Sequence, residues 1–152
     1  MILANENDIY IFFEIIEQLE PKSILDLGMF LKRVGSVSRK IMNNELPCDI
    51  RLDGVDFFPE INFPVWNNVY DEIINYKTYF GNNQNRKYDC AILLGTKELK
   101  KTVSFSEIIN AVEENARYML VSDDSEIQTQ KKHKIVDLKV EGDTYYLIDF
   151  GE

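Results

Sequence analysis

Residues 23–35 read Ser-Ile-Leu-Asp-Leu-Gly-Met-Phe-Leu-Lys-Arg-Val-Gly, and this stretch sets the fold class of the chain. The apolar run from Ile24 to Leu27 predicts a buried parallel strand, which leads into a glycine loop. A helical pattern then begins at Val34. In α/β proteins a strand, a loop and a helix in this order hold a ligand at the carboxyl end of the strand. The stretch therefore predicts a nucleotide-type binding site.

The rest of the chain alternates between helical and strand patterns. Before this stretch, an amphipathic helix is expected over residues 5–20, capped by Asn5 or Asn7. The patterns after it predict three more helices: one with Val34, Val37 and Ile41 on its buried face, one over 65–74, and one beginning near Ser104 or Ser106. Four further strands are predicted over 49–58, 76–80, 88–95 and 118–121. The chain then ends in a hairpin whose turn is Glu141-Gly142-Asp143.

This order of elements predicts an α/β fold in a single domain, residues 1–152. Five strands separated by helices call for a mostly parallel sheet with helices on both faces, and the hairpin adds two antiparallel strands to make seven. The N-terminal helix, within residues 1–21, is expected to pack on this sheet.

The acidic composition narrows the range of partners. The chain has 152 residues, with 26 Asp and Glu against 17 Lys and Arg, and a formal net charge of -9. Because the phosphate backbone repels such a charge, we expect no nucleic-acid partner. No apolar run reaches the ~18 residues of a membrane helix, and the N-terminus lacks a basic flank. We therefore expect no membrane partner and a cytoplasmic protein.

Cysteine and histidine give no sign of a metal site. Cys48 and Cys90 lie next to or inside predicted strands, where a buried thiol is the simplest interpretation. His133 lies in a polar connection. No Cys/His cluster has metal-ligand spacing, so we expect no metal.

Five residues are expected at the carboxyl ends of the strands, where such sheets bind ligands. They are Asp26 and Gly28 after the first strand, Asp56 and Phe57 after the second, and Gly95 after the fourth. A carboxylate accepts two donors, so Asp56 suits both hydroxyls of a ribose, and Phe57 suits the base. Asp26 has two open interpretations, which are contact with a ligand and hydrogen bonding to the amides of the next loop or helix. No residue is identified as catalytic.

The chain resembles the class I S-adenosylmethionine-dependent methyltransferases in the runs Ile24–Gly28, Leu52–Asp56 and Tyr88–Gly95 and in the order of its elements. The resemblance covers essentially the whole chain. It implies a Rossmann-like methyltransferase fold and S-adenosylmethionine as the cofactor. It also implies that Asp56 binds the cofactor ribose, that the loop from Gly28 passes the methionine part, and that Asp26 lies beside that part.

The same loop departs from the family pattern. The family's loop runs Gly-x-Gly-x-Gly, and Phe30 and Lys32 stand where its second and third glycines would be. Any Cβ there obstructs the close approach of backbone to ligand, so the sequence favours a degraded cofactor site. The preferred hypothesis is a non-catalytic methyltransferase-like domain, a pseudoenzyme, that binds or scaffolds an unidentified protein or small molecule.

Two alternatives stay open. The first is an active S-adenosylmethionine-dependent small-molecule methyltransferase with an altered loop, which Asp26, Gly28 and Asp56 favour. The second is a site for another nucleotide or a phosphorylated ligand, held by Lys32 and Arg33 near the start of the helix. The simpler interpretation of these two residues, which the sequence favours, is a solvated basic pair in an acidic protein. A homo-oligomer is also open, because the hairpin is expected to leave an exposed sheet edge.

Overall fold

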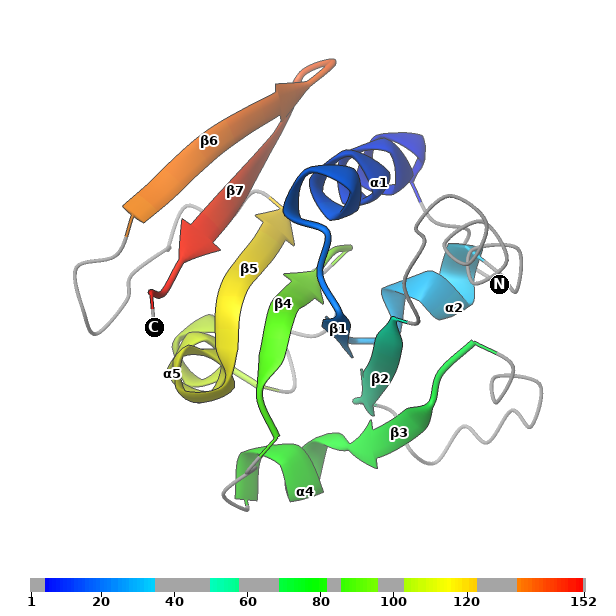
Figure 1. The fold of residues 1–152 in the computed structure, drawn as a ribbon, viewed down its shortest axis with the longest axis vertical. Helices are drawn as coiled ribbons and strands as arrows, with labels where there is room; N and C mark the ends of the chain where they lie inside the picture. Colours follow the sequence, from blue (N-terminus) through cyan, green and yellow to red (C-terminus); the bar gives the residue numbers. More distant parts are fainter. Residues whose placement is uncertain are drawn as a thin grey trace.

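The described residues form one sheet of seven strands in the order β3-β2-β1-β4-β5-β7-β6 (Figure 1). The structure is a computed structural model, and it describes residues 5–34, 50–57, 69–81, 86–95, 103–122 and 134–151. The strands are β1 (Ser23–Leu27), β2 (Arg51–Asp56), β3 (Glu72–Asn75), β4 (Tyr88–Leu93), β5 (Ala116–Ser122), β6 (Lys134–Val140) and β7 (Asp143–Asp149).

The strand pairing confirms the predicted sheet. β1 pairs in parallel with both β2 and β4, β2 pairs in parallel with β3, and β4 pairs in parallel with β5. β7 runs antiparallel between β5 and β6. Strand order reverses between β1 and β4, so the carboxyl ends of these two strands form the switch point of the sheet.

Helices cover both faces of the sheet, as predicted. They are α1 (Glu6–Leu19), α2 (Phe30–Val34), α4 (Tyr76–Gly81) and α5 (Phe105–Asn115). Phe12 of α1 and Phe30 of α2 belong to the core cluster on one face. Tyr79 of α4 and Ile108 of α5 belong to the cluster on the other face. The sheet therefore lies between two layers of helices, and α1 and α2 share the layer beside the predicted ligand loop.

Polar caps begin two of these helices at positions that the sequence indicates. Asn5 Oδ1 accepts a hydrogen bond of 2.8 Å from the backbone N–H of Asn7 at the start of α1. Ser104 Oγ accepts one of 3.3 Å from the backbone N–H of Glu107 at the start of α5. The Asn5 and Ser104 options of the prediction are confirmed.

The third strand lies earlier in the chain than predicted. The strand expected over residues 76–80 is wrong, because β3 covers Glu72–Asn75 and the following residues form α4. Asn75 Oδ1 accepts a hydrogen bond of 2.9 Å from the backbone N–H of Lys77 and so satisfies one of the amides that begin this helix.

The helix expected over residues 65–74 is wrong for residues 69–74, because 69–71 are not helical and 72–74 belong to β3. In β3, Ile73 lies in register with Gly54 of β2, and Ile74 with Val55. β-branched side chains suit a strand, and pairing with a neighbouring strand overrides the local helical spacing.

Other predictions fall outside the described residues. They are both ends of the strand over 49–58, the continuation past Val34 of the helix expected to begin there, residues 65–68 of the predicted helix, Cys48 and His133. The start of that helix is described, and the prediction of Val34 is wrong, because α2 begins at Phe30. The described part of the second strand, Arg51–Asp56, agrees with the prediction.

Candidate functional site at the switch point

The Asp26 carboxylate lies at the carboxyl end of β1 and is fully buried. Its Oδ1 accepts a hydrogen bond of 2.8 Å from the backbone N–H of Phe30. Its Oδ2 accepts one of 2.8 Å from the backbone N–H of Leu31 and one of 2.6 Å from the Tyr70 hydroxyl. Asp26 thus holds the first turn of α2 against the end of β1, as its structural interpretation predicts.

Burial and hydrogen bonding act on the pKa of Asp26 in opposite directions. Burial raises this pKa above the ordinary value for aspartate, and the bonds from Tyr70, Leu31 and Phe30 lower it without reversing the shift. Burial and the adjacent Asp26 raise the pKa of Tyr70 well above its ordinary value. The Tyr70 hydroxyl therefore keeps its proton and remains a donor to Asp26.

The Phe30 ring belongs to the core between α2 and α1. It is fully buried, and its centroid lies 6.0 Å from that of Phe12 in α1. The Arg33 guanidinium lies over the ring, with Cζ 5.6 Å from the ring centroid. Phe30 therefore anchors α2 to α1 at the position where the family pattern has its second glycine.

Arg33 reaches from α2 to the residues that follow β4. Its Nη2 donates a hydrogen bond of 2.7 Å to the Leu94 carbonyl. Gly95 has φ +69°, and a Cβ on this residue would lie 2.6 Å from Arg33 Nη1. The guanidinium therefore lies directly against the Gly95 backbone. Arg33 Nε is buried and has no hydrogen-bond partner in the part of the chain that the structure describes.

The turn after β1 contains two left-handed residues, Gly28 with φ +88° and Met29 with φ +59°. The Gly28 N–H donates a hydrogen bond of 3.0 Å to the Val55 carbonyl, which ties the turn to β2. Met29 is buried, and a Cβ on Gly54 would lie 2.5 Å from its Sδ and 3.0 Å from the Tyr70 ring. Met29 of the turn and the Tyr70 ring therefore fill the space over β2, and position 54 accommodates them because it is a glycine.

The two predicted site residues at the end of β2 have different surroundings. Asp56 is half-buried and lies in register with Asn75 of β3. Phe57 is 2% exposed, and its ring is stacked on Tyr76 with centroids 5.6 Å apart and an interplanar angle of 13°. The contacts of Asp56 with a ribose and of Phe57 with a base stay predictions.

The chain was compared with protein families, curated proteins and solved structures. No protein-family model and no curated protein matches the chain. Among solved structures, the O-methyltransferase TomG from Streptomyces achromogenes, in complex with S-adenosylmethionine, has a TM-score of 0.63 at 10% identity over 98% of this chain and 81% of its own. An rRNA methylase from Escherichia coli has a TM-score of 0.58 at 13% identity over 93% of this chain. The methyltransferase domain of bacterial CtHen1 has a TM-score of 0.58 at 10% identity over 96% of this chain and 99% of its own.

The chain has the class I methyltransferase fold. At these identities the likeness concerns the fold alone, and it confirms the Rossmann-like architecture expected from the sequence. The chain spans 62% of the length of the rRNA methylase.

The switch point of this methyltransferase fold suits the two ends of S-adenosylmethionine differently. The resemblance assigns the methionine end to Asp26 and the loop after Gly28. The described residues there offer a buried carboxylate that already accepts three hydrogen bonds, and an arginine that lies against Gly95. At this end the cofactor carries two cations, the ammonium and sulfonium groups, and one anion, the carboxylate, so the charge of Arg33 opposes the first two alone. Because Asp26 is already hydrogen-bonded within the chain and Arg33 lies against Gly95, these residues do not fit the methionine end, and the ribose contact of Asp56 stays a prediction.

Two contacts at this site are not evident from the sequence. Tyr70 lies 44 positions from Asp26, and no local pattern connects its hydroxyl with that carboxylate. The sequence gives anion binding by Lys32 and Arg33 as an alternative, which stays a prediction, and it does not indicate the hydrogen bond of Arg33 to the Leu94 carbonyl after β4. Its spacing of three residues from Phe30 on a helix is the one signal that indicates its position over that ring.

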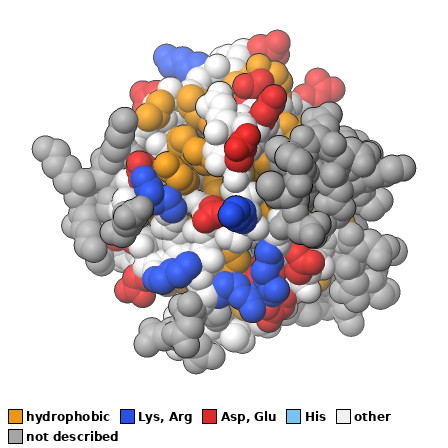
Figure 2. Space-filling model, viewed as in Figure 1, with side chains coloured by type: hydrophobic (Ala, Val, Ile, Leu, Met, Phe, Trp, Pro, Cys, Tyr) orange, Lys and Arg blue, Asp and Glu red, His pale blue; other side chains and the backbone are white. Residues whose placement is uncertain are grey.

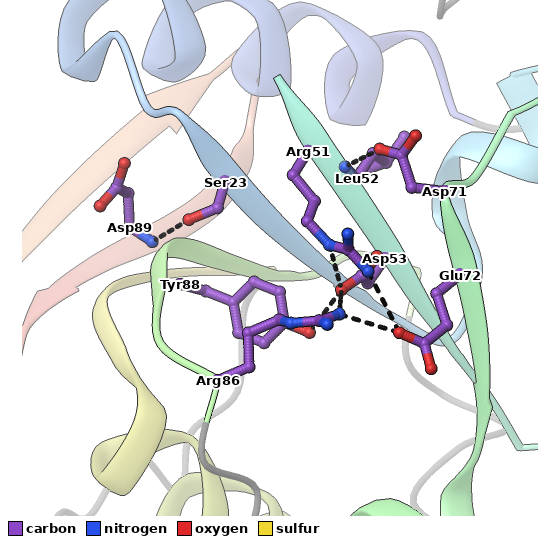
Figure 3. A network of polar contacts seen from close by, with 9 residues as sticks. All are labelled: Ser23, Arg51, Leu52, Asp53, Asp71, Glu72, Arg86, Tyr88 and Asp89. Carbon is purple, nitrogen blue, oxygen red and sulfur yellow. Dashed lines mark hydrogen bonds and ion pairs between the residues drawn. The ribbon is translucent and has the colours of Figure 1, made fainter. Parts of the chain in front are cut away.

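A second polar cluster lies at the opposite, amino ends of the strands (Figure 3). Asp53 of β2 is fully buried, and its Oδ2 accepts hydrogen bonds from Arg51 at 3.1 Å and Arg86 at 2.8 Å. The Tyr88 hydroxyl donates to the same oxygen at 2.7 Å. Glu72 of β3 accepts from both arginines, at 3.1 and 2.8 Å. Two acids and two arginines thus join β2, β3 and the start of β4, away from the switch point.

The described surface carries charges of both signs. Figure 2 shows Lys and Arg side chains intermingled with Asp and Glu on one face, with hydrophobic side chains between them. Among the described residues, no three His, Cys, Asp or Glu side chains are placed to hold a metal ion. Within the same ranges, no helix has the length and apolar character needed to cross a membrane.

Proposed function

We propose that this chain is a methyltransferase-fold domain that has lost methyl transfer and acts in the cytoplasm by binding or scaffolding a partner, either a protein or a small molecule. The observation that carries the proposal is that the chain's own groups occupy both sides of the switch point. Asp26 holds α2 on the β1 side, and Arg33 lies against Gly95 on the β4 side.

The hydrogen bonds and the burial of Asp26 support the loss of cofactor binding. An ionised carboxylate offers about four acceptor positions, and an ammonium ligand needs at least one of them within reach. Three are taken by Phe30, Leu31 and Tyr70, and the side chain has no exposure to solvent. A ligand amine would have to displace the bonds that hold the first turn of α2.

Charge and packing support the same conclusion. Arg33 brings a permanent positive charge to the switch point, where the sulfonium and ammonium cations of the cofactor outnumber its one carboxylate. Phe30 cannot leave its place without exposing a ring that is now fully buried against Phe12. The net charge of -9 disfavours a nucleic-acid partner, so the proposal concerns a protein or a small molecule.

Titration calorimetry with S-adenosylmethionine and S-adenosylhomocysteine tests the proposal. We expect no binding heat from either ligand at millimolar concentration, and micromolar binding to the unmodified chain would refute the proposal. Arg33→Ala removes the guanidinium that lies against Gly95 and is expected to increase the affinity for both ligands. Lys32→Ala, the matched control, removes the same charge from the neighbouring residue and is expected to leave the titration unchanged.

A second candidate function is methyl transfer to a small molecule through an altered loop. It is favoured by the carboxylate of Asp56 at the end of β2, together with the left-handed glycines Gly28 and Gly95 beside the switch point. This candidate predicts micromolar binding of S-adenosylmethionine that Asp56→Asn weakens at least tenfold, because an amide loses one of the two acceptor roles toward a ribose.

A further inference from the structure

β6 is the last strand of the sheet on the hairpin side, among the residues that the structure describes. Among the described strands it pairs with β7 alone, and Figure 1 shows it on the outer side of the hairpin. Ile135 and Val136 are 39% and 42% exposed, and Asp137 and Lys139 are exposed as well. No described strand pairs with the outer side of these 7 residues, and a strand edge of this kind is a template for pairing with another strand.

The turn of the hairpin defines which backbone groups of β6 point outward. Glu141 and Gly142 have φ +44° and +92°, as a two-residue type I′ turn requires. Such a turn closes on a hydrogen-bonded pair, here Val140 with Asp143. Hydrogen bonding to the partner strand then alternates along β6. The residues whose N–H and C=O groups point to the free edge are Ile135, Asp137 and Lys139.

We propose that β6 pairs antiparallel with β6 of a second copy of this chain, about a twofold axis at Leu138. Antiparallel pairing in this register places Asp137 of each copy opposite Lys139 of the other. The outward backbone groups of these residues then bond to each other, and their side chains form one ion pair on each side of the axis. Both contacts follow from a single self-complementary surface, as a twofold dimer requires.

Charge complementarity selects this register. An axis at Asp137 places the two Asp137 side chains opposite each other, and an axis at Lys139 does the same to the two lysines. An axis at Val136 places Asp137 opposite an isoleucine. A shift by one residue turns each side chain to the wrong face of its partner. The axis at Leu138 alone brings the strand's central acid opposite its central base.

The apolar side chains of β6 fit the same register. Val136, Leu138 and Val140 alternate with the charged residues, and Leu138 and Val140 pack against the core cluster under α1. The axis at Leu138 places this residue opposite its own copy and Val136 opposite Val140. The apolar face of one hairpin therefore continues into the next, and the exposed Val136 gains a neighbour.

This edge is independent of the switch point. β5 and β7 lie between β4 and β6 in the sheet. Pairing through β6 therefore does not rest on the proposed function, and the cofactor titrations have the same expected outcome for a monomer and for a dimer.

Sedimentation equilibrium of the full chain tests the pairing. We expect a reversible dimer at high micromolar concentration. Asp137→Lys places like charges opposite each other on both sides of the axis, and we expect it to weaken dimerisation about tenfold or more. Combining Asp137→Lys with Lys139→Asp exchanges the two charges and restores opposite pairs, so we expect dimerisation to return.

Glu17→Lys is the matched control, because it changes the net charge equally on an exposed position of α1. It is expected to leave the dimer unchanged, and thermal melting followed by circular dichroism checks that each variant is folded. A chain that stays monomeric up to millimolar concentration overturns the proposal and leaves the edge for a strand of another protein. A dimer that Asp137→Lys does not weaken, or that the exchanged pair does not restore, overturns it as well.

Discussion

The role of the Asp26 carboxylate depends on the groups that donate hydrogen bonds to it. An acid at the end of the first strand of this fold suits a ligand, and the sequence supports that role and a structural one equally. The donors that it meets are the amides of α2 and the Tyr70 hydroxyl, all of them within the chain. Because these bonds satisfy a buried charge, breaking them has a cost that a ligand would have to offset.

Removing the Tyr70 hydroxyl tests how strongly the chain depends on this arrangement. We expect Tyr70→Phe to lower the free energy of unfolding by about 1–3 kcal/mol, because it removes a donor to a buried carboxylate. It also removes the 3.1 Å acceptor of the Lys32 backbone N–H. Urea unfolding at neutral pH measures the change.

Tyr79→Phe is the matched control for this prediction. The Tyr79 hydroxyl is also buried, and it donates at 2.9 Å to Asn115, a neutral amide. We expect a loss of about 1 kcal/mol there, since a bond to a neutral group contributes less than a bond to a charged one. A smaller loss for Tyr70→Phe than for Tyr79→Phe would contradict the role given to Asp26.

Between elements, the contact of Arg33 with Gly95 joins α2 to the end of β4. A side chain at position 95 would meet the guanidinium at 2.6 and 2.8 Å, below ordinary contact distances. Gly95 also has φ +69°, which disfavours any residue with a Cβ. Steric crowding and backbone strain therefore act together at this position, and substitutions can separate them.

We expect Gly95→Ala to lower the free energy of unfolding more than Gly142→Ala does. Gly142 has a comparable φ of +92° but no atom within 4 Å of its added Cβ, so it reports the backbone penalty alone, about 1 kcal/mol. In an Arg33→Ala background, Gly95→Ala should cost only as much as Gly142→Ala. A double-mutant cycle measured by urea unfolding gives the difference. Equal costs for Gly95→Ala with and without Arg33 would show that the contact is absent.

For the molecule as a whole, the excess negative charge and the buried acids both lower the free energy of unfolding as the pH rises. The net charge of -9 opposes compaction through self-repulsion. Burial raises the pKa of Asp26 and also of Asp8 in α1, even though Asp8 accepts a hydrogen bond from Tyr145 and lies near Arg33. Asp143 raises the pKa of Asp8 further.

We expect the free energy of unfolding to rise as the pH falls from neutral toward the raised pKa values of these acids. The folded chain holds protons on Asp8 and Asp26 at a pH where the unfolded chain has released them, so the stability that they contribute is lost as the pH rises through their folded pKa values. Urea unfolding over a pH series measures the slope. High salt screens the repulsion of surface charges and leaves the contribution of the buried acids.

Asp8→Asn isolates one of these acids. Its amide oxygen still accepts from the Tyr145 hydroxyl, and the group no longer titrates. We expect a shallower dependence of stability on pH at high salt, whereas Glu17→Asn, at an exposed position of the same helix, should leave the slope unchanged. An unchanged slope in Asp8→Asn would mean that Asp8 is ionised to the same extent in both states.

Local sequence patterns were sufficient for most of the architecture. Hydrophobic spacing predicts β1, β2, β4 and β5 and the helices α1 and α5, and the caps Asn5 and Ser104 are read from single polar residues next to apolar periods. The turn at Glu141-Gly142 defines the closing hairpin. These features are accessible because each depends on residues within a few positions of one another.

Long-range contacts account for the rest. Ile73 and Ile74 become part of a strand because Gly54 and Val55 of β2 lie beside them, and no spacing within the segment records that neighbour. The motif of residues 23–35 likewise indicates a ligand loop from local sequence alone. Its contacts are set by distant parts of the chain, because folding brings Tyr70 to Asp26 and Arg33 to Gly95. Sequence alone therefore places Asp26, Gly28 and Gly95 at the ends of the strands, because each follows its own apolar run. Folding brings Tyr70 and Arg33 to them, because only the tertiary structure determines which distant side chains satisfy a buried group.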